Sequence, residues 1–497
     1  MQDVASVPPA LNDASLLRVN ALLDGEWLDA PARFWVRDPA SHAVLAELAS
    51  HGAESARLAV EAAARALPAW RGRSALDRGR LLNRWAQLLR QHTDDLALLM
   101  TSEQGKPLAE SRGEVAYAAS FLEWYAEEGR RVHGETLQSP DPSKRAWVWK
   151  QPVGVCAAIT PWNFPLAMIT RKVAPALAAG CTVMVKPAEQ TPLTALACAE
   201  LALRAGLPAG VLAVLCASAE DSISIGKFWC EHPLVRHLSF TGSTEVGRIL
   251  MAQCAPTLKR LSLELGGHAP FIVFDDAALE AAVEGAIQSK YRNAGQTCVC
   301  ANRFYVQSGI HDAFVSRLAE RVSELKLGPG TASGVQVGPL IDSAAVAKVK
   351  AHVDDALAQG AQVRVGGQLR PELGAHFFEP TVLTGVTSRM QVANEETFGP
   401  VAPVLQFDTE AQVVALANAS EFGLASYFYS RDMGRVMRVA EALEYGMVGI
   451  NTGLLASAEF PFGGVKQSGF GREGARQGIE EYFDVKFLSV GGLGLTA

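Results

Sequence analysis

Short apolar segments alternate with helical stretches from about residue 153 onwards, and this alternation restricts the possible folds most strongly. Segments 154–159 and 182–185 have strand character, and a helical stretch at 195–205 follows them. Strands that are bounded by Gly and Pro and separated by helices form βαβ units, which build a buried parallel sheet. The pattern resumes with an apolar strand at 270–274 and a helical stretch at 279–289. The sequence therefore predicts two successive α/β units.

Three other regions differ from this alternation. Apolar residues recur at helical spacing over 53–67 and 76–99, and Pro68 predicts that the first helix stops there. Segment 132–153 has the pattern of a two-stranded arm around a Ser-Pro-Asp-Pro turn, and the tail at 482–490 has strand character and could pair with it. An isolated two-stranded hairpin is marginal in water, so we expect the arm to pack against another surface, such as a second subunit.

Size and charge narrow the functional classes. A chain of 497 residues holds two or three domains, and its 49% hydrophobic and 20% charged residues are ordinary for a soluble globular enzyme. The net charge of −7 disfavours a nucleic-acid-binding surface, which needs a basic patch. The longest largely apolar run, 173–185, is too short for a membrane span and contains Pro175 and Gly180. We expect neither nucleic acid nor a membrane among the partners.

The N-terminus and the cysteines favour an intracellular protein. Residues 1–4 lack the basic start and apolar block of a secretory signal, so a cytoplasmic location is expected. Eight cysteines in so long a chain do not form a disulfide framework, and no ligand cluster predicts a metal. The six cysteines expected to be small buried hydrophobes are Cys156, Cys181, Cys198, Cys216, Cys230 and Cys254.

Two short motifs carry candidate chemistry. Cys298 follows Gly295, Gln296 and Thr297, and Glu264 lies upstream in the sequence Leu-Glu-Leu-Gly-Gly, at the junction of the two α/β units. A thiolate attacks electrophilic carbon far better than a thiol, and a carboxylate can act as general base on the thiol or on a water. Glycine near each residue lets the chain approach a ligand closely. Together they predict covalent catalysis on a carbonyl group.

Three loops that follow strands supply candidate binding groups. Asn163, in a Thr-Pro-Trp-Asn-Phe-Pro sequence, could donate its amide to an oxyanion or could be only a turn residue. Lys186 and Glu189 could hold ribose hydroxyls or form a solvated pair. Segment 240–247 joins a strand to a helix, and Gly242 would let the backbone approach a pyrophosphate at the helix N-terminus. It lacks the ending of a P-loop, which argues against an ATPase or kinase.

In combination these motifs resemble the aldehyde dehydrogenase superfamily, from about residue 23 to 487. Within it the chain is most similar to the NAD(P)-dependent succinate-semialdehyde dehydrogenase group, through segments 168–172 and 292–303. The resemblance implies an α/β fold with a Rossmann-type cofactor domain, an α/β catalytic domain and a β oligomerisation arm. The implied boundaries are 1–130 and 154–264 for the NAD-binding domain, 265–467 for the catalytic domain, and 131–153 with 480–497 for the arm.

The resemblance also assigns roles to individual residues. Cys298 is the implied nucleophile, Glu264 the base that activates the deacylating water, and Asn163, with the Cys298 amide, the oxyanion hole. Lys172 and Glu473 match positions proposed to relay protons from the base. The implied cofactor contacts are Thr160, Trp162, Lys186, Glu189, Gly226, Gly242, Ser243, Val246, Gly247, Leu265, Glu396 and Phe398.

The implied reaction is the NAD-dependent oxidation of an aldehyde to an acid. The Cys298 thiolate attacks the aldehyde, the thiohemiacetal transfers hydride to the nicotinamide, and water activated by Glu264 hydrolyses the thioester. A carboxylate at Glu189 would repel the 2′-phosphate of NADP, so NAD is expected and NADP is less favoured. The resemblance also implies a homodimer or homotetramer.

The expected substrate is a small aldehyde with a distal carboxylate. Arg171 and Arg292 match arginines that grip that carboxylate in the resembling group, although arginines also form structural ion pairs. The group usually has a serine where this chain has Ala456, and neighbouring Ser457 could replace it after a loop shift. Succinate semialdehyde leads, with glutarate semialdehyde, 2-oxoglutarate semialdehyde and other ω-carboxylated aldehydes as alternatives.

Three further alternatives stay open. Cys300, two residues after the nucleophile, could form a reversible disulfide with Cys298 or point into the core. A cysteine hydrolase could use the same thiol, base and oxyanion donor, but no histidine adjoins Cys298 and the nucleotide-type motifs would have no purpose. A non-catalytic scaffold is disfavoured by the intact set of Asn163, Glu264, Cys298 and Glu396.

Overall fold

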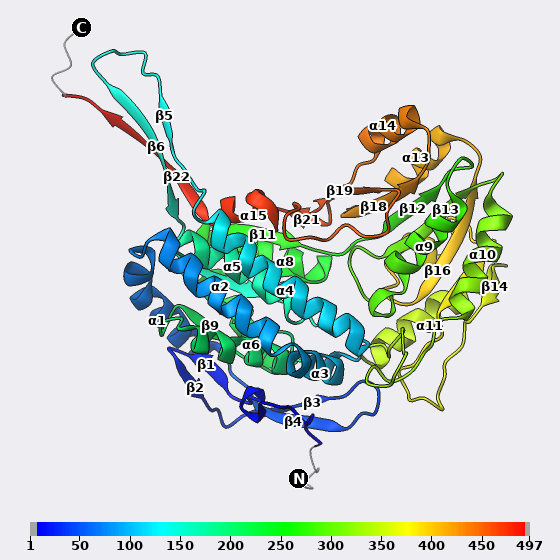
Figure 1. Cartoon of the computed structure of the whole chain (residues 1–497), viewed down its shortest axis with the longest axis horizontal. Coiled ribbons are helices and arrows are strands. Elements are labelled where there is room, and N and C mark those ends of the chain that lie inside the picture. The colour runs from blue at the N-terminus through cyan, green and yellow to red at the C-terminus, as the bar shows by residue number, and fades with distance from the viewer. Residues whose placement is uncertain (1–6, 493–497) are drawn as a thin grey trace.

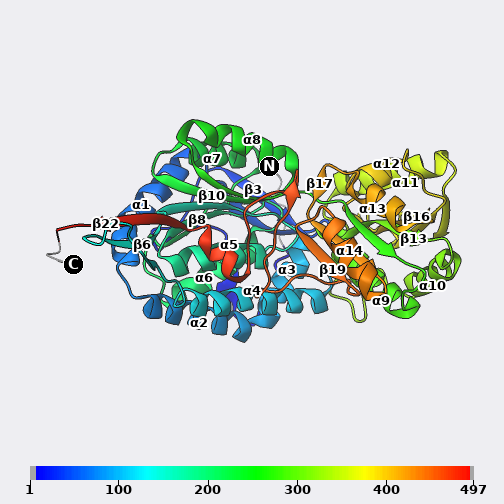
Figure 2. The same ribbon diagram turned by 90° about the horizontal axis from the view of Figure 1, so that it is seen from above.

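The structure, a computed structural model, describes residues 7–492. The predicted α/β organisation is confirmed, because strands and helices alternate through most of that range. Figure 2 shows two units of sheet and helices side by side. Residues 1–6 and 493–497, which belong to the predicted cofactor domain and arm, lie outside the described residues.

An eight-stranded sheet organises the first unit. Its strands, in spatial order, are β2 (Glu26–Leu28), β1 (Ala21–Leu23), β9 (Leu212–Val214), β8 (Thr182–Lys186), β7 (Val155–Ile159), β10 (Val235–Thr241), β11 (Arg260–Glu264) and β21 (Gly469–Phe470). Strands β7 to β11 run parallel, while β1 and β21 pair antiparallel at either side of them. The carboxyl ends of the parallel strands therefore meet at one edge, where open α/β sheets bind ligands.

Helices cover both faces of this sheet. They are α1 (Ala53–Arg71), α2 (Ala75–Gln91), α3 (Thr93–Gln104), α4 (Leu108–Glu128), α5 (Ala167–Ala179), α6 (Pro192–Ala205), α7 (Ala219–Glu231) and α8 (Thr244–Cys254). Along β7, Cys156 and Ala158 belong to the core formed with α2, α4, α5 and α6, whereas Val155 and Ala157 belong to the core formed with α1, α7 and α8. Successive side chains of a strand point to opposite faces, so an unbroken apolar strand needs helices on both sides.

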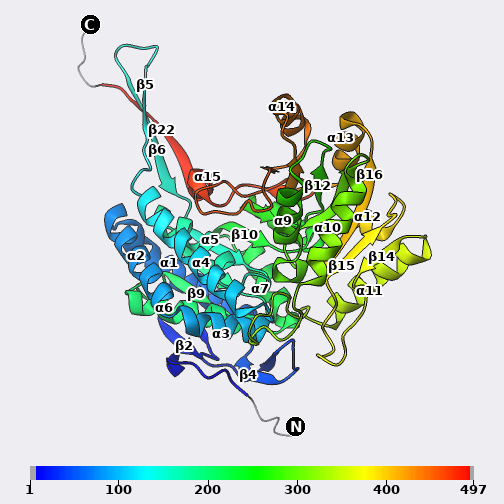
Figure 3. The same ribbon diagram turned by 45° about the vertical axis from the view of Figure 1, so that its right-hand side comes forward.

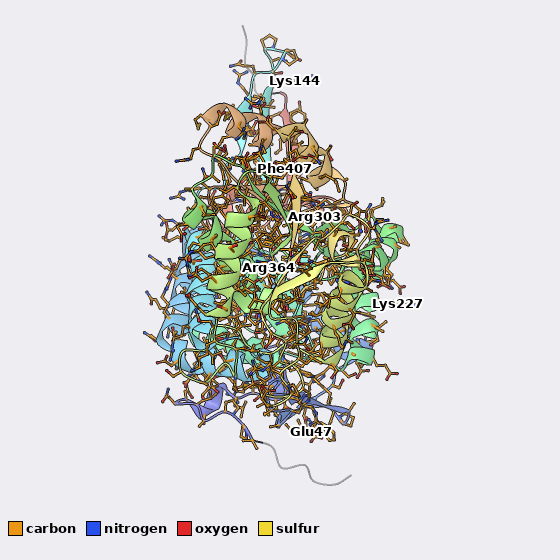
Figure 4. All side chains as sticks on the ribbon, turned by 90° about the vertical axis from the view of Figure 1, so that its right-hand side faces the viewer. Glu47, Lys144, Lys227, Arg303, Arg364 and Phe407 are labelled. Carbon is orange, nitrogen blue, oxygen red and sulfur yellow. The ribbon has the colours of Figure 1, made fainter. Side chains whose placement is uncertain are left out.

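A seven-stranded sheet organises the second unit. Its strands, in spatial order, are β14 (Gln362–Val365), β15 (Thr381–Thr384), β16 (Val401–Phe407), β13 (Ala301–Gln307), β12 (Ala269–Val273), β18 (Ala425–Tyr429) and β19 (Met447–Ile450). Its helices are α9 (Leu279–Lys290), α10 (His311–Ser323), α11 (Ser343–Ala358), α12 (Gln391–Asn394), α13 (Glu410–Asn418) and α14 (Met433–Ala442). Only β14 runs antiparallel to its neighbour. Figure 4 looks onto this unit, with Arg303 of β13, Arg364 of β14 and Phe407 of β16 labelled.

A three-stranded arm projects away from both units (Figures 1 and 3). It consists of β5 (Glu135–Leu137), β6 (Arg145–Pro152) and β22 (Phe483–Val490), with β6 in the middle. The predicted pairing of the tail with the arm is therefore confirmed, and it is antiparallel along all of β6. Large apolar side chains remain open to solvent on the arm, including Trp149 at 48% and Phe487 at 61% exposure.

Smaller elements complete the described chain. They are the strands β3 (Arg33–Arg37), β4 (Val44–Ala49), β17 (Phe422–Gly423) and β20 (Val465–Lys466), the helix α15 (Ala475–Glu480), and 3-10 helices at Ala14–Leu16, Ala255–Thr257 and Arg292–Gly295.

The expected stop of the first helix at Pro68 is wrong, whereas the helical spacing over 76–99 is confirmed. Helix α1 continues through Pro68 to Arg71, because a proline near a helix end removes one amide donor while its carbonyl still accepts, here from Gly72 N at 3.2 Å. The helical pattern at 76–99 is divided between α2 and α3 at His92, whose φ of −100° and ψ of 25° are not helical. Apolar spacing does not detect such a break because both helices bury the same side.

Candidate active site

A cavity of about 400 Å³ lies where loops from the two units meet, a size typical of small-molecule sites. Ten of the predicted site residues line it: Trp162, Asn163, Arg171, Gly242, Ser243, Leu265, Arg292, Cys298, Glu396 and Phe398. The other predicted residues lie off the lining: Thr160, Lys172, Lys186, Glu189, Gly226, Val246, Gly247, Glu264, Cys300, Ser457 and Glu473. The cavity thus brings the nucleophile, the amide donor and both arginines together.

A strained turn positions the nucleophile loop. In the 3-10 helix Arg292–Gly295, Asn293 and Ala294 have φ of 52° and 53°. Residues other than glycine rarely adopt positive φ, and such a backbone persists where neighbouring contacts over-determine it. The backbone amide of Asn293 donates to Glu110 Oε2 at 2.8 Å, which is one such contact. The turn therefore fixes where the chain enters the loop that carries Cys298.

The Cys298 thiol is partly exposed toward the cavity. Burial raises the pKa of Cys298 to about 12, although the positive charge of Arg171 acts in the opposite direction. The thiolate is the reactive nucleophile. A base must therefore take the thiol proton as the thiol attacks.

Two buried carboxyl groups, whose pKa values are shifted in opposite directions, lie beside the cavity. Glu264, the last residue of β11, is 2% exposed, and its Oε2 has no hydrogen-bond partner among residues 7–492. Burial raises the pKa of Glu264 well above its usual value, and the nearby charge of Glu473 adds to this. Burial also acts to raise the pKa of Glu473, but Arg171 and Lys172 outweigh it, so that pKa is lowered. Glu264 is therefore the group suited to hold and exchange a proton.

Lys172 connects the Glu473 carboxylate to the first sheet. Its buried ammonium donates to Glu473 Oε1 and to Ser239 Oγ, the latter at 2.9 Å. Glu264 itself does not line the cavity.

Asn163 lies in the loop that follows β7. Its Nδ2 donates to the Gln296 carbonyl at 3.0 Å, and its Oδ1 is buried without a partner among the described residues. A primary amide has two N–H donors, so one remains for a ligand oxygen. The contact with Gln296 ties this amide to the same loop as Cys298.

The carboxyl edge of the first sheet offers groups that suit a dinucleotide. Lys186, at the end of β8, donates to Ser222 Oγ at 2.7 Å and lies 3.5 Å from Glu189 Oε2. Ser243 caps α8 by accepting from Val246 N at 3.3 Å, so the first amides of that helix face the cavity side. A Cβ at Gly242 would overlap the Phe240 ring, whereas one at Gly226 would find ordinary space.

Buried hydroxyl groups and close packing support the same interpretation. Thr160 Oγ1 and Thr241 Oγ1 are buried without partners in residues 7–492, and Thr241 lines the cavity. A Cβ at Gly247 would lie 2.5 Å from Leu265 Cδ2, so this glycine lets α8 approach the Glu264 strand end. Unsatisfied donors beside an open cavity fit a polar ligand such as a nucleotide.

Glu396 joins the second unit to the Glu264 loop. Its Oε1 accepts from Gly267 N at 3.1 Å, and burial raises the pKa of Glu396 to about 7. Phe398, with a φ of 54°, meets Trp162 edge-to-face at 5.6 Å between ring centroids. Both residues therefore lie opposite the first sheet across the cavity.

The two predicted anion-binding arginines differ in their partners. Arg171 is 1% exposed, its Nε pairs with Glu473, and its guanidinium lies 4.2 Å from the Phe462 ring centroid. Its Nη2 has no partner among the described residues. Arg292 forms no ion pair with any residue of 7–492, and it lies 5.1 Å from the Phe164 ring centroid. Arg292 therefore offers a guanidinium that no carboxylate of residues 7–492 pairs with, whereas Arg171 offers one free donor edge.

Two predicted residues face away from the cavity. The Ser457 hydroxyl donates to Glu459, so its expected replacement of the missing serine still requires the loop shift, and Ala456 presents only a methyl group to the cavity. Cys300 is fully buried, and Lys290 Nζ donates to its Sγ at 3.2 Å. All eight cysteines are free thiols.

Sequence reasoning missed several residues that hold this site. Lys106 and Glu114 form a buried ion pair beneath the Asn163 loop, and Gln104 contacts Asn293. Lys348 of α11 lines the cavity. The only sequence signal was a lysine in a Gly-Lys-Pro connection between two helices, which is also typical of a solvated turn.

Neither a metal site nor a membrane-spanning helix is present among residues 7–492. No group of His, Cys, Asp or Glu residues there is arranged to hold a metal ion. No helix in the same range combines the length and apolar character needed to cross a bilayer.

Comparisons with known proteins agree with this arrangement. The model described as the aldehyde dehydrogenase family matches residues 27–488. The chain is 57% identical over 483 residues to an NADP(+) succinate-semialdehyde dehydrogenase of Escherichia coli (strain K12), covering 97% of this chain and 99% of that one. It is 58% identical over 482 residues to a glutarate-semialdehyde dehydrogenase of Pseudomonas putida (strain KT2440), covering 97% and 99%.

A solved structure, succinate-semialdehyde dehydrogenase from Burkholderia pseudomallei, matches with a TM-score of 0.95 and 60% identity over 97% of this chain and 100% of that one. Fold and comparisons thus define an oxidoreductase with a nicotinamide-type cofactor. The chain belongs to the aldehyde dehydrogenase family, and the predicted resemblance is confirmed. The printed name of the E. coli relative specifies NADP(+), which differs from the NAD preference expected here.

Gly267→Ala tests the contact between the base loop and the nucleophile loop. A Cβ at Gly267 would overlap the Cys298 carbonyl oxygen, so the nucleophile must shift. Small displacements of reacting groups can cost on the order of 100-fold in rate. We expect aldehyde oxidation to fall by about that factor, measured as NADH formation.

The matched control is Gly113→Ala, on α4, where a Cβ would meet nothing within 4 Å. This variant should retain full activity, and its helix should be slightly more stable. Full activity of Gly267→Ala would show that the contact does not position Cys298.

Proposed function

We propose that this enzyme oxidises small aldehydes carrying a distal anionic group, above all succinate semialdehyde, with NAD as acceptor. The observation that carries this is that the guanidinium of Arg292 lies in the same cavity as Cys298 and forms no ion pair with a carboxylate of residues 7–492. An arginine without a carboxylate partner, beside a nucleophile, suits a substrate that brings its own carboxylate.

Each chemical step has a candidate residue. Glu264 or water takes the Cys298 proton as sulfur bonds to the aldehyde carbon, and Asn163 Nδ2 with the Cys298 amide stabilises the oxyanion. Bound beside Cys298, a nicotinamide would supply the hydride acceptor that turns the thiohemiacetal into a thioester. Glu264 then removes a proton from water, which adds to the thioester carbon while the carbon–sulfur bond breaks. We assign to Lys172 and Glu473, which form a buried ion pair, the role of carrying the proton away.

Cys298→Ala and Glu264→Gln separate the two halves of the reaction. Without the thiol no substrate is oxidised, so Cys298→Ala should show no NADH formation at 340 nm. Glu264→Gln keeps the nucleophile but loses the base for water. We expect a burst of NADH close to the enzyme concentration and a steady rate lowered on the order of 100-fold.

Unchanged steady turnover in Glu264→Gln would contradict the role of Glu264 in deacylation. Release of acid and alcohol from an ester by wild-type enzyme that reduces neither NAD nor NADP with any aldehyde would instead favour the cysteine hydrolase.

The choice of aldehyde depends on the distal end of the cavity. Two relatives are named for succinate and glutarate semialdehyde, and Ala456 leaves out a hydroxyl donor. Arg292 and the free edge of Arg171 remain to bind the carboxylate. We propose succinate semialdehyde first, with the glutarate and 2-oxoglutarate semialdehydes as longer alternatives.

Arg292→Met should separate anionic from neutral aldehydes. A charge-assisted hydrogen bond contributes about 1.5–3 kcal/mol, so kcat/KM for succinate semialdehyde should fall roughly 10-fold to 100-fold. The kcat/KM for hexanal should change little, because that substrate has no carboxylate. Arg364→Met, on the exposed strand β14 (Figure 4), is the matched control and should leave both values unchanged. Equal losses for both aldehydes would contradict the carboxylate clamp.

The cofactor preference depends on Glu189. Its carboxylate is held beside Lys186 at the end of β8, where a ribose is expected to lie. A 2′-phosphate there would meet a like charge, and such juxtaposition is unfavourable. We therefore propose NAD, although one relative is named for NADP(+).

Glu189→Ser should shift the preference toward NADP. Removing the repulsion is expected to raise the ratio of kcat/KM with NADP to that with NAD by about 10-fold or more. Wild-type enzyme that is equally efficient with both cofactors would contradict this interpretation of Glu189.

We also propose a domain division, an oligomeric state, a redox disulfide and a cellular location for this protein. The division into domains at 264 and 265, and a homodimer or homotetramer built through the arm, follow from the resemblance and from the exposed apolar side chains of β6 and β22. A reversible disulfide between Cys298 and Cys300 requires Cys300 to leave its contact with Lys290. The cytoplasmic location is also a prediction.

A further inference from the structure

We infer that Lys106 is a positioning residue for oxyanion stabilisation: buried beneath the site, it fixes the Asn163 main chain and so aims the Asn163 side-chain amide at the oxygen of the Cys298 adduct. The inference rests on the proposed roles of Cys298 and Asn163. It adds a residue that does not line the cavity and that lies far from both motifs in the sequence.

Lys106 has an environment unusual for a lysine. It lies between α3 and α4, is 2% exposed, and pairs with Glu114 Oε2 at 2.5 Å, with each side chain 1% exposed. Its ammonium also lies 4.0 Å from the Phe164 ring centroid. Burying both charges is costly, and replacing such pairs by neutral residues is often harmless to stability. A contribution to stability therefore explains the presence of this ion pair only weakly. Its contacts with the Asn163 loop offer a second explanation.

The ammonium of Lys106 donates to the Asn163 carbonyl oxygen at 2.6 Å. Asn293 Nδ2 donates to the same oxygen at 3.0 Å, and Gln104 Nε2 donates to Asn293 Oδ1 at 2.9 Å. Two donors on one carbonyl fix the peptide plane, and with it the direction in which the Asn163 side chain leaves the chain. The Asn163 side chain is held at its tip, where Nδ2 donates to the Gln296 carbonyl.

Glu114 extends the same support along the loop. Its Oε1 accepts from the amides of Leu166 at 3.0 Å and Ala167 at 3.2 Å, at the start of α5. The Lys106–Glu114 pair therefore holds the Asn163 loop at two points, the Asn163 carbonyl and the start of α5. Phe164, between these points, also lies 5.1 Å from the guanidinium of Arg292.

An oxyanion donor stabilises charge only when it is held where the oxygen will lie, because reorganisation during the reaction cancels its benefit. Neither Asn163 nor Cys298 has a regular element to hold it, since both are in loops. The buried cation provides the fixed point that a helix or strand would otherwise supply.

The test is a double-mutant cycle on the double variant Lys106→Met/Glu114→Gln. It removes both charges at nearly constant volume, and the carboxamide oxygen introduced by Glu114→Gln can still accept from the α5 amides. The readout is the burst of p-nitrophenolate from p-nitrophenyl acetate. In that burst the Cys298 sulfur bonds to the acetyl carbon, the ester C–O bond breaks, and no cofactor is needed. NADH formation from succinate semialdehyde is followed in parallel.

We expect the double variant to lower the acylation rate roughly 10-fold to 100-fold, which is less than the loss caused by removing an oxyanion donor outright, because the Asn163 amide is displaced and not deleted. In an Asn163→Ala background the same pair of changes should alter the rate by less than about twofold, because the group they position is gone. The KM for NAD should stay unchanged in every variant.

The matched control is Lys227→Met/Glu231→Gln, the same substitutions in an exposed pair on α7, where Figure 4 labels Lys227. It should leave both rates unchanged. Multiplying effects of the double variant and Asn163→Ala, or an unchanged acylation rate in the double variant, would overturn the inference. If Glu114→Gln with Lys106→Met fails to fold, Lys106→Arg, which keeps the charge but replaces the compact ammonium by a larger planar guanidinium, must show the same non-additivity.

The two proposals fail separately. A wild-type enzyme that is acylated by the ester but reduces no NAD or NADP would contradict the dehydrogenase function, and the cycle would still decide the role of Lys106.

Discussion

The junction at Gly267 is the constraint on which the rest of the site depends. Its amide donates to Glu396 of the second unit at 3.1 Å, and the absence of a Cβ leaves room for the Cys298 carbonyl. The carboxylate loop from the first sheet can therefore touch the nucleophile loop from the second. Without this close approach, the two α/β units could form a fold but could not share one cavity.

Some of the charged groups around the cavity form ion pairs, and others have no charged partner. Arg171 and Lys172 are both committed to Glu473, which keeps that carboxylate ionised in a buried place. Glu264, with no such partner, has a raised pKa and can exchange a proton. Arg292, which also lines the cavity, forms no ion pair with a carboxylate of the described residues. Arg171 connects the two sets of groups, because it lines the cavity and pairs with Glu473.

Much of the fold could be predicted from the sequence, because apolar strands and amphipathic helices have distinct periods. The strands around Val155 and Phe271 and the pairing of the C-terminal tail with the arm follow from such patterns. The continuation of α1 through Pro68 could not be predicted, since its cost depends on how little helix remains beyond the proline.

Site residues could be predicted where the chemistry of the side chain itself indicates a role. The Cys298 thiol and the Asn163 amide were found in this way, whereas Arg171 and Arg292 were predicted from the resemblance to the family. Ten of the predicted residues line one cavity. The missed residues act through contacts between distant segments, as Lys106 does on the Asn163 carbonyl, and no local pattern marks them. The orientation of Ser457 was also beyond prediction, because its hydroxyl bonds to the nearer partner Glu459.

The central claim is that a covalent bond forms between the substrate and the Cys298 sulfur. Rapid acid quenching of the Glu264→Gln enzyme after mixing with NAD and succinate semialdehyde, followed by peptide mass spectrometry, tests this most directly. The account predicts a succinyl thioester on the peptide that contains Cys298, present only when NAD is added. NADH production with no acyl group on that peptide, or with the acyl group on another cysteine, would contradict it.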